Sequence, residues 1–299
     1  MAKKHPILKG LGLLTGFVLV VFAAAFFYAY LTGGDAKALS LLAGDGVGIL
    51  QVEGTINDSR DVLTELRRFR EAPWIKAIVL RIDSPGGAVA PTQEIFDELQ
   101  KVRSKKPLIA SMGGMATSGG YYIASACEKI VANPGTMTGS IGVIMQLNNI
   151  EELMKKVGVK GQNIKSGANK DIGSPFQALS PEGQAILQSL VDNVHGQFVS
   201  AVAIGRGMDE AVVKKLADGR VYSGAQAKDL GLVDELGNLE YAVDLAAKRV
   251  GLEESPVVYY SRLEQERWWG RLFFSLTGIQ WSGSDRPGLR YEWSLSLLR

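Results

Sequence analysis

Apolar and polar positions along this chain follow two alternating patterns. Short apolar runs rich in β-branched residues predict strands, and longer segments with apolar positions three and four residues apart predict amphipathic helices. Three strand–helix pairs follow one another, at 46–54 and 59–73, at 76–83 and 90–104, and at 107–114 and 118–127. This alternation is typical of an α/β protein whose sheet is largely parallel.

The second half of the chain contains shorter strands and longer helices. The predicted strands are 129–133, 138–146 and 159–165, and the predicted helices are 149–158, 180–204, one from Asp209 and one from Leu239. The longest helix opens with Ser180 as its N-cap and Pro181 in its first turn, a combination common at helix starts. Connections stay short, so we expect one domain, over residues 47–255.

Residues 11–32 form an apolar run of the length that a membrane helix requires. At about 1.5 Å per residue, such a helix crosses a hydrocarbon core of roughly 30 Å. Small residues at 23–25 are compatible with signal-peptide cleavage, but the apolar run continues well past them, which favours an uncleaved transmembrane helix. Lysines precede the run. By the positive-inside rule, we expect residues 1–10 in the cytoplasm and the chain after the linker 33–46 outside it.

Composition narrows the possible functions. The 33 basic and 31 acidic residues are interspersed and give a formal net charge of +2, so no basic stripe marks a nucleic-acid surface. The single cysteine, Cys127, excludes an intrachain disulfide and a cysteine-rich metal site. We therefore expect no nucleic-acid partner, no metal and no cofactor.

The tail, residues 256–299, differs from the rest of the chain. It holds four of the five tryptophans, interspersed with arginines. Such a segment suits a membrane interface, and docking on a partner subunit explains it equally well. Both interpretations stay open.

Candidate chemistry begins with the stretch GGMATSGGYYIAS, residues 113–125. Ser118 ends a predicted strand and opens a predicted helix, where a serine often caps the first turn. The same position lies at the carboxyl edge of a parallel sheet, where α/β proteins bind ligands and where hydrolases place nucleophilic serines. The sequence differs from the G-x-S-x-G elbow. Ser118 is therefore a cap or a nucleophile.

A second glycine pair, Gly86-Gly87, follows the preceding strand in the stretch DSPGG. It could form an ordinary Pro-Gly turn. Alternatively, it brings a backbone N–H beside Ser118, as the second donor that an oxyanion hole requires.

A nucleophilic serine needs a base, and the histidines are poorly placed for that role. His5 precedes the predicted membrane helix, and His195 lies within a long helix far from glycine-rich turns. Lysine is the remaining precedent, provided that its pKa falls by about 3 units from roughly 10.4. Lys165 and Lys170 lie in a small-residue loop, and spacing does not choose between them. Asp171 would keep Lys170 charged unless its side chain points elsewhere.

The motifs DSPGG, MATSGGYYIAS, TGSIGVIM, KSGANKDIGSP and DGRVYSGAQAKDLGLVDELG occur in this order. Their series resembles the signal peptide peptidase A family, over residues from about 47 to 250. That family consists of membrane-anchored bacterial Ser–Lys peptidases with a Clp-protease and crotonase-like spiral of βαβ units. The match is to the short form, with one copy of the domain.

The resemblance implies a role for each matched position. Ser118 is implied as the nucleophile, Lys170 as the general base and Ser140 as the residue that orients the lysine. The N–H groups of Gly87 and Gly119 are implied as the oxyanion hole. Asp83, at a position where the family also has asparagine, receives no role from the sequence.

The resemblance also implies a setting for the reaction. The catalytic domain would lie outside the cytoplasmic membrane and degrade cleaved signal peptides and other apolar, unfolded peptides. Subunits of short-form relatives form a ring, by resemblance an octamer, in which serine and lysine meet across a subunit boundary. Two rival interpretations remain: a crotonase-type acyl-CoA enzyme on the same fold, and a membrane scaffold without catalysis.

Overall fold

The computed structural model describes residues 15–21, 44–253, 255–261 and 290–292. The chain divides into two compact units, Met1–Asp45 and Gly46–Arg299. In the first unit residues 15–21 are helical, and the rest of the membrane helix expected at 11–32 lies outside the described residues. No helix within the described ranges is long and apolar enough to cross a bilayer.

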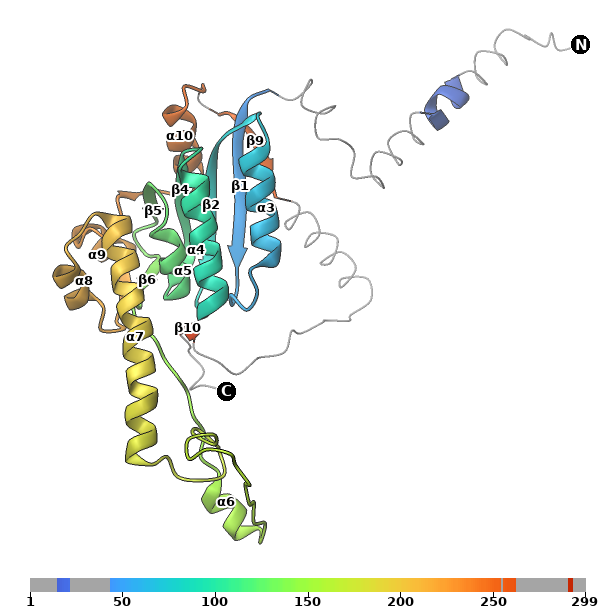
Figure 1. The fold of residues 1–299 in the computed structure, drawn as a ribbon. Helices are drawn as coiled ribbons and strands as arrows, with labels where there is room; N and C mark the ends of the chain where they lie inside the picture. The colour runs from blue at the N-terminus through green and yellow to red at the C-terminus, as the bar shows by residue number, and fades with distance from the viewer. Residues whose placement is uncertain (1–14, 22–43, 254, 262–289, 293–299) are drawn as a thin grey trace, which may run out of the picture. The chain divides into compact units, whose positions relative to one another are not determined.

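The second unit is built on a mostly parallel sheet of eight strands (Figure 1). Its strands are β1 (Gly46–Glu53), β2 (Ile75–Ser84), β4 (Leu108–Thr117), β5 (Lys129–Ala132), β6 (Met137–Gly139), β7 (Val221–Ser223), β8 (Glu235–Leu236) and β9 (Val257–Tyr260). The main order is β7-β6-β4-β2-β1-β9, and β5 joins β4 to β8. All these pairs are parallel except β6 with β7.

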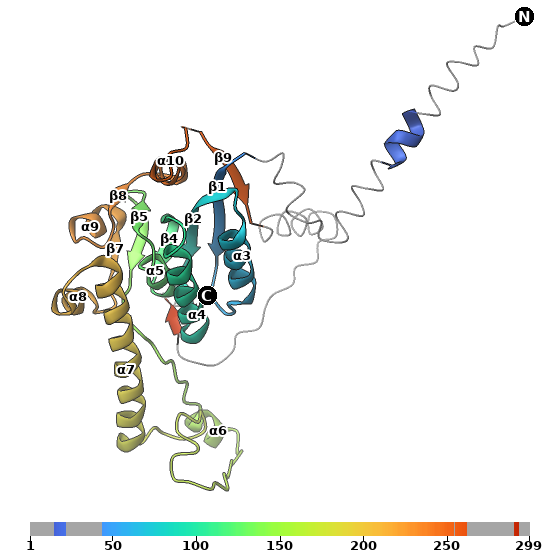
Figure 2. The same cartoon turned by 45° about the horizontal axis from the view of Figure 1, so that its top comes forward.

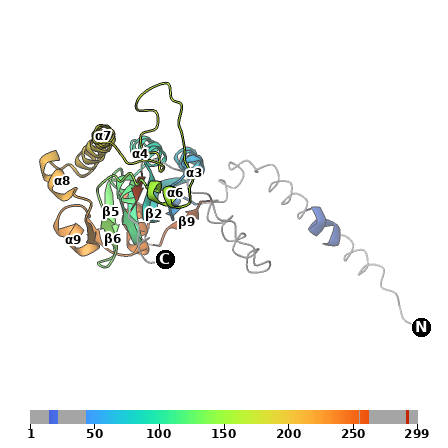
Figure 3. The ribbon, with the colours of Figure 1, turned by 90° about the horizontal axis from the view of Figure 1, so that it is seen from below.

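Helices cover both faces of this sheet. The helices of this unit are α3 (Arg60–Glu71), α4 (Val89–Arg103), α5 (Gly119–Ala124), α6 (Glu151–Lys156), α7 (Pro181–Arg206), α8 (Glu210–Leu216), α9 (Gly224–Asp229) and α10 (Leu239–Arg249). Figure 2 shows α10 on the side of the sheet opposite α3 and α4, and Figure 3 shows α3, α4 and α7 along one side.

The packing of the core explains why the sequences of the strands are continuous apolar runs. Along β2, Ile78, Leu80 and Ile82 pack in the larger cluster with α3, α4 and α5. The intervening Ala77 and Val79 pack in a second cluster with α10. A parallel strand covered on both faces loses the apolar–polar alternation of a half-exposed strand. Each large aliphatic side chain buried this way stabilises the fold by about 2 kcal/mol.

Most predicted elements are confirmed, and two are wrong. The strand predicted over 138–146 ends at Gly139, because Ser140 adopts a positive φ of 51° that breaks the extended backbone. The strand predicted over 159–165 is absent, and these residues form an exposed, irregular segment without a ladder partner. Strand β9 joins the sheet beyond residue 255, where the sequence places the end of the domain.

Residues 142–179, which we call the arm, connect β6 to α7 and include α6. In Figures 1 and 2 the arm extends past the N-terminal end of α7, away from the sheet. Large apolar side chains are exposed along it at Leu147, Leu153, Val157, Val159, Ile164 and Phe176. A monomeric protein rarely leaves so many apolar side chains uncovered on one segment, so the arm has the character of a contact surface.

Candidate active site

The pairing of β4 with β6 brings two candidate serines together. Thr117 and Gly139 are partners at the end of this parallel ladder, and each is followed directly by a serine. The Ser118 N–H donates to the carbonyl oxygen of Gly139 at 2.8 Å. Ser118 and Ser140 are therefore neighbours at the carboxyl edge of the sheet, as the roles implied by the resemblance require.

Both serines adopt backbone conformations that favour glycine. Ser118 has φ 53° and Ser140 has φ 51°, and Ser255 is the one further non-glycine residue with positive φ in the described part of the chain. Such conformations cost about 1–3 kcal/mol each and persist where surrounding structure holds them, often at functional sites. The surroundings are buried here, because Ser118 is 1% and Ser140 is 6% exposed.

The side chain of Ser118 does not cap α5. Ser118 occupies the N-cap position, but at φ 53° and ψ −117° its side chain makes no capping hydrogen bond to the helix. A capping serine normally has an extended backbone, as Ser180 does at the start of α7. The capping interpretation of Ser118 is therefore wrong. A strained turn between strand and helix is instead the geometry of a nucleophile elbow.

Two backbone N–H groups near Ser118 are available to hold an oxyanion. Gly119 is the first residue of α5, and the first N–H groups of a helix lack intrahelical partners. Gly87 lies in the short strand β3 (Gly86–Ala88). Ile56 donates to the Gly86 carbonyl and accepts from the Ala88 N–H, both at 2.8 Å. Because alternate residues of a strand bond to opposite edges, the Gly87 N–H points to the other edge.

Gly87 also has a steric requirement. A Cβ atom there would lie 2.6 Å from the backbone N and C atoms of Ile56, closer than two non-bonded carbon atoms approach. The turn before it is held by Ser84, whose Oγ donates to Gly54 O at 2.6 Å and accepts from the Gly86 N–H at 3.1 Å. The second glycine pair is thus a strand fixed beside the serine turn and not an ordinary Pro-Gly turn.

The two glycine-rich turns meet at the start of α5. A Cβ at Gly120 would lie 2.9 Å from the carbonyl oxygen of Ser84, so only glycine allows the helix to approach this closely. On the edge of β3 to which the Gly87 N–H points, a segment of the tail, β10 (Arg290–Glu292), pairs in antiparallel register with Tyr291 opposite Gly87. This edge therefore accepts an extended peptide chain.

The lysine loop resolves one alternative that the sequence leaves open. Lys165 Nζ donates to Asp171 Oδ1 at 2.6 Å and to Ala168 O at 2.9 Å. The hydrogen bond from Lys165 lowers the pKa of the Asp171 carboxyl below its ordinary value. Asp171 therefore points to Lys165 and not to Lys170. Because its Nζ is engaged by a carboxylate and a carbonyl, Lys165 is the poorer candidate base.

The structure does not bring Lys170 to the serines. Lys170 is exposed on the arm, and the chain between α6 and α7 that carries it lies away from α5 in Figure 1. Within the described ranges, no hydrogen bond joins Lys170 to Ser118 or Ser140. His195, on α7, is half-buried, and His5 lies outside the described residues. Among the described residues of one chain, the serines and glycines form a partial site to which Lys170 makes no hydrogen bond.

Two threonines that the sequence analysis missed help to shape this site. Thr138 Oγ1 donates to the Ala116 carbonyl at 2.8 Å, and Thr136 Oγ1 donates to the Gly113 carbonyl at 2.7 Å. Both come from the segment TMTGS that leads to Ser140. The spacing of the two threonines could have indicated their shared role, because positions two apart on a strand face the same side.

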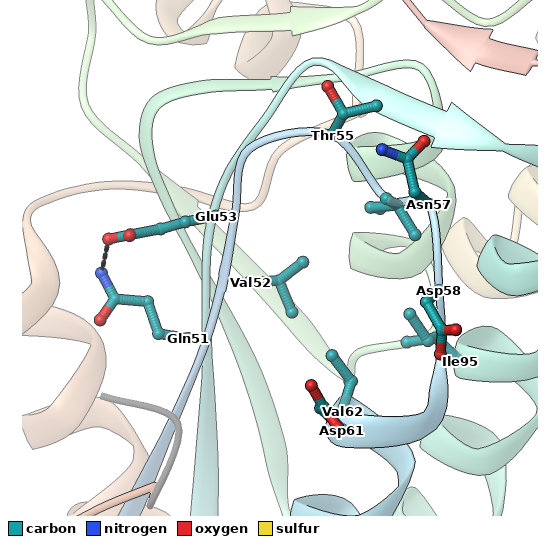
Figure 4. Close-up of a pocket in the computed structure, with 10 residues that line it drawn as sticks. Gln51, Val52, Glu53, Thr55, Asn57, Asp58, Asp61, Val62 and Ile95 are labelled. Carbon is teal, nitrogen blue, oxygen red and sulfur yellow. Dashed lines mark hydrogen bonds between the residues drawn. The ribbon is translucent and has the colours of Figure 1, made fainter. Parts of the chain in front are cut away.

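A cavity of about 500 Å³ lies beside this edge of the sheet (Figure 4). Val52, Ile56, Val62 and Ile95 give it an apolar wall. The carboxylates of Glu53, Asp58 and Asp61 also line it. Asp58 is engaged by Arg60 in an ion pair at 2.9 Å. Because Ile56 both lines the cavity and bridges to Gly87, the cavity adjoins the candidate oxyanion strand.

A strained serine elbow on a parallel sheet edge, beside a glycine strand whose Gly87 N–H points to an edge that pairs with an extended segment, is the arrangement of a hydrolase that stabilises an oxyanion. Comparison with known families agrees. The model for peptidase family S49 matches residues 100–253. A protein named as a protease in Synechocystis sp. is 48% identical over 210 residues, 70% of this chain and 76% of the relative.

Two further relatives carry more specific names. A protein named as a signal peptide peptidase SppA in Enterococcus faecium is 38% identical, over 76% of this chain and 67% of that one. Protease 4 of Salmonella typhi is 37% identical, over 73% of this chain and 37% of that longer one. The chain belongs to peptidase family S49, within the group of SppA and protease 4 relatives, and is a serine peptidase.

Proposed function

We propose that this protein is a Ser–Lys endopeptidase in which Ser118 is the nucleophile and Lys170 the general base. The conformation of Ser118 carries the proposal: the residue is buried, its backbone is strained, and its hydroxyl is not used to cap α5. Ser140 would orient the lysine, because it lies beside Ser118 across the β4–β6 ladder.

The reaction would proceed through an acyl-enzyme. Ser118 Oγ attacks the peptide carbonyl carbon while its proton passes to Lys170 Nζ, and the N–H groups of Gly87 and Gly119 stabilise the oxyanion. The C–N bond then breaks, and the leaving amine takes the proton from the lysine. A water molecule, deprotonated by the same lysine, hydrolyses the ester and regenerates the serine.

A second copy of the chain would supply the lysine. Lys170 lies on the arm, whose apolar side chains are exposed in one chain. Packing the arm on a neighbouring subunit would cover these side chains and bring Lys170 toward the neighbour's Ser118. Burial among apolar groups is also what lowers the pKa of a lysine enough for it to act as a base. We therefore propose a homo-oligomeric ring with its active sites at subunit boundaries.

Apolar, unfolded peptides, such as cleaved signal peptides, would be the substrates. The edge of β3 accepts an extended chain, and the adjoining cavity has an apolar wall. The apolar run at 11–32 would anchor the protein in the bacterial cytoplasmic membrane, with residues 1–10 inside and the catalytic unit outside. The name of the relative from Enterococcus faecium, a signal peptide peptidase, supports this substrate class, and the name of the relative from Salmonella typhi, protease 4, supports peptidase activity.

The test is subunit complementation with the full chain in detergent. Ser118→Ala and Lys170→Ala should each be inactive on an apolar fluorogenic peptide, and Lys165→Ala is the matched lysine control. When the two inactive variants are dissociated, mixed and reassembled, mixed boundaries should regain activity. Activity in either single variant would refute the dyad. A mixture that stays inactive while mixed oligomers form would refute the shared site.

A further inference from the structure

A β-bulge precedes the serine elbow. Strands β2 and β4 pair in parallel but lose register between Ile82 and Ser84. At this point Asp83 alone lies opposite the three β4 residues 113–115. Bulges of this kind bend a strand and redirect the side chains that follow, and they are common next to active sites. Here the residue that follows the end of β4 is Ser118.

The side chain of Asp83 is exposed and lies against the bulge. Its Oδ1 accepts a hydrogen bond from the Met115 N–H at 3.1 Å. A Cβ at Gly113 would lie 2.7 Å from Asp83 Oδ2, and one at Gly114 would lie 3.7 Å from Oδ1. Gly113 therefore leaves room for this carboxylate, whereas a Cβ at Gly114 would make ordinary contact with it, a distinction that the sequence does not reveal.

Other side chains bind backbone carbonyl groups of the same segment of β4. Thr136 and Thr138 bind the carbonyls of Gly113 and Ala116 from β6. From β2, the Arg81 guanidinium donates to the Met112 carbonyl at 3.0 Å. In these contacts the threonine hydroxyls and the guanidinium act as donors to carbonyl oxygens. Asp83 supplies the acceptor that fixes an N–H group of the bulge.

We propose that Asp83 is a positioning residue for the nucleophile. By accepting from the Met115 N–H, it fixes the path of β4 into Thr117 and thus the placement of the Ser118 hydroxyl relative to the oxyanion donors. The proposal rests on the proposed function of Ser118. The role requires an acceptor oxygen and not a negative charge, so an asparagine, which keeps Oδ1, should perform it.

The experiment compares Asp83→Ala and Asp83→Asn in the full chain, with Asp244→Ala on α10 as a control for an exposed aspartate. We expect Asp83→Ala to lower kcat about tenfold, the size of one lost hydrogen bond to a charged acceptor. KM should change less than about twofold, because substrate pairs with β3 and not with the bulge. The rate of Ser118 labelling by a fluorophosphonate should fall in parallel. Asp83→Asn and Asp244→Ala should match the wild type in all three measurements.

The outcomes separate this inference from the proposed function. An inactive wild type, or an active Ser118→Ala variant, would refute the proposed function. With an active wild type, an Asp83→Ala variant that keeps full kcat would overturn the positioning role. So would an Asp83→Asn variant as slow as Asp83→Ala, because the charge and not the acceptor would then matter. If Asp83→Ala does not fold, the comparison of Asp83→Asn with wild type still decides the question.

Discussion

The oxyanion strand offers a sharp test, because one added methyl group should displace it. In Gly87→Ala, the Cβ would lie 2.6 Å from the Ile56 backbone, whereas ordinary contacts of a Cβ begin at 3.4 Å. The nearest atoms belong to the backbone and cannot rotate away. Strand β3 must therefore move by roughly 1 Å, and a displacement of that size costs about a hundredfold in rate.

Loss of one oxyanion donor independently predicts a similar effect, about a hundredfold to a thousandfold in kcat. The assay is steady-state hydrolysis of an apolar fluorogenic peptide, with folding checked by thermal unfolding. Gly135→Ala is the matched control, because a Cβ at Gly135 would meet no atom within 4 Å. A folded Gly87→Ala variant with more than about a tenth of wild-type kcat would contradict both steps of the reasoning.

Three further predictions concern the tail, the second lysine and a buried ion pair. Deleting residues 288–299 should raise the rate on short peptides, because β10 covers the edge of β3 at Gly87; an unchanged or lower rate would count against that contact. Lys165→Ala should keep most of the activity, and a dead variant would make Lys165 the base. Burial tends to raise the pKa of Asp234, but hydrogen bonding and charge from Arg206 lower it on balance. This stabilisation is present at neutral pH and is lost as the pH falls through the lowered pKa. Asp234→Asn should therefore cost about 3 kcal/mol in urea unfolding at pH 7 and less at pH 3, since it leaves the buried Arg206 guanidinium without its carboxylate, although Arg206 still donates to the Gly231 carbonyl; an equal cost at both pH values would refute the linkage.

The sequence predicts the sheet well, because burial on both faces imposes a long apolar run. Strands β1, β2 and β4 are of this kind. The two strand predictions that failed, at 138–146 and 159–165, failed for a physical reason. The apolar run that continues to Ile144 belongs to the arm, where Ile144 is 53% exposed. An apolar pattern indicates that a side chain is to be covered, but not whether its own chain or another covers it.

The residues of the candidate site also differ in whether the sequence could predict their roles. Ser118 and Gly87 could be predicted together because each follows a predicted strand, whereas Ser140 entered only through the family resemblance. The role of Gly113 could not be predicted, because it depends on a loss of register that brings Asp83 opposite it. Strand register is set by three-dimensional packing and leaves little trace in local sequence.

The division of the site between the sheet and the arm leads to a final prediction, on concentration. If the proposed lysine arrives from a second copy, assembly covers the arm, buries the lysine among apolar side chains and completes the site in one step. The isolated chain would hold a strained serine without Lys170 beside it, since Lys170 is exposed on the arm. Specific activity should therefore rise with protein concentration and reach a plateau when light scattering shows complete assembly.

The substitution Leu153→Glu on the arm should shift this curve to higher concentration, while Asp244→Ala should leave it in place. Specific activity that stays constant down to the monomer would show that one chain closes its own site, and would place the base elsewhere.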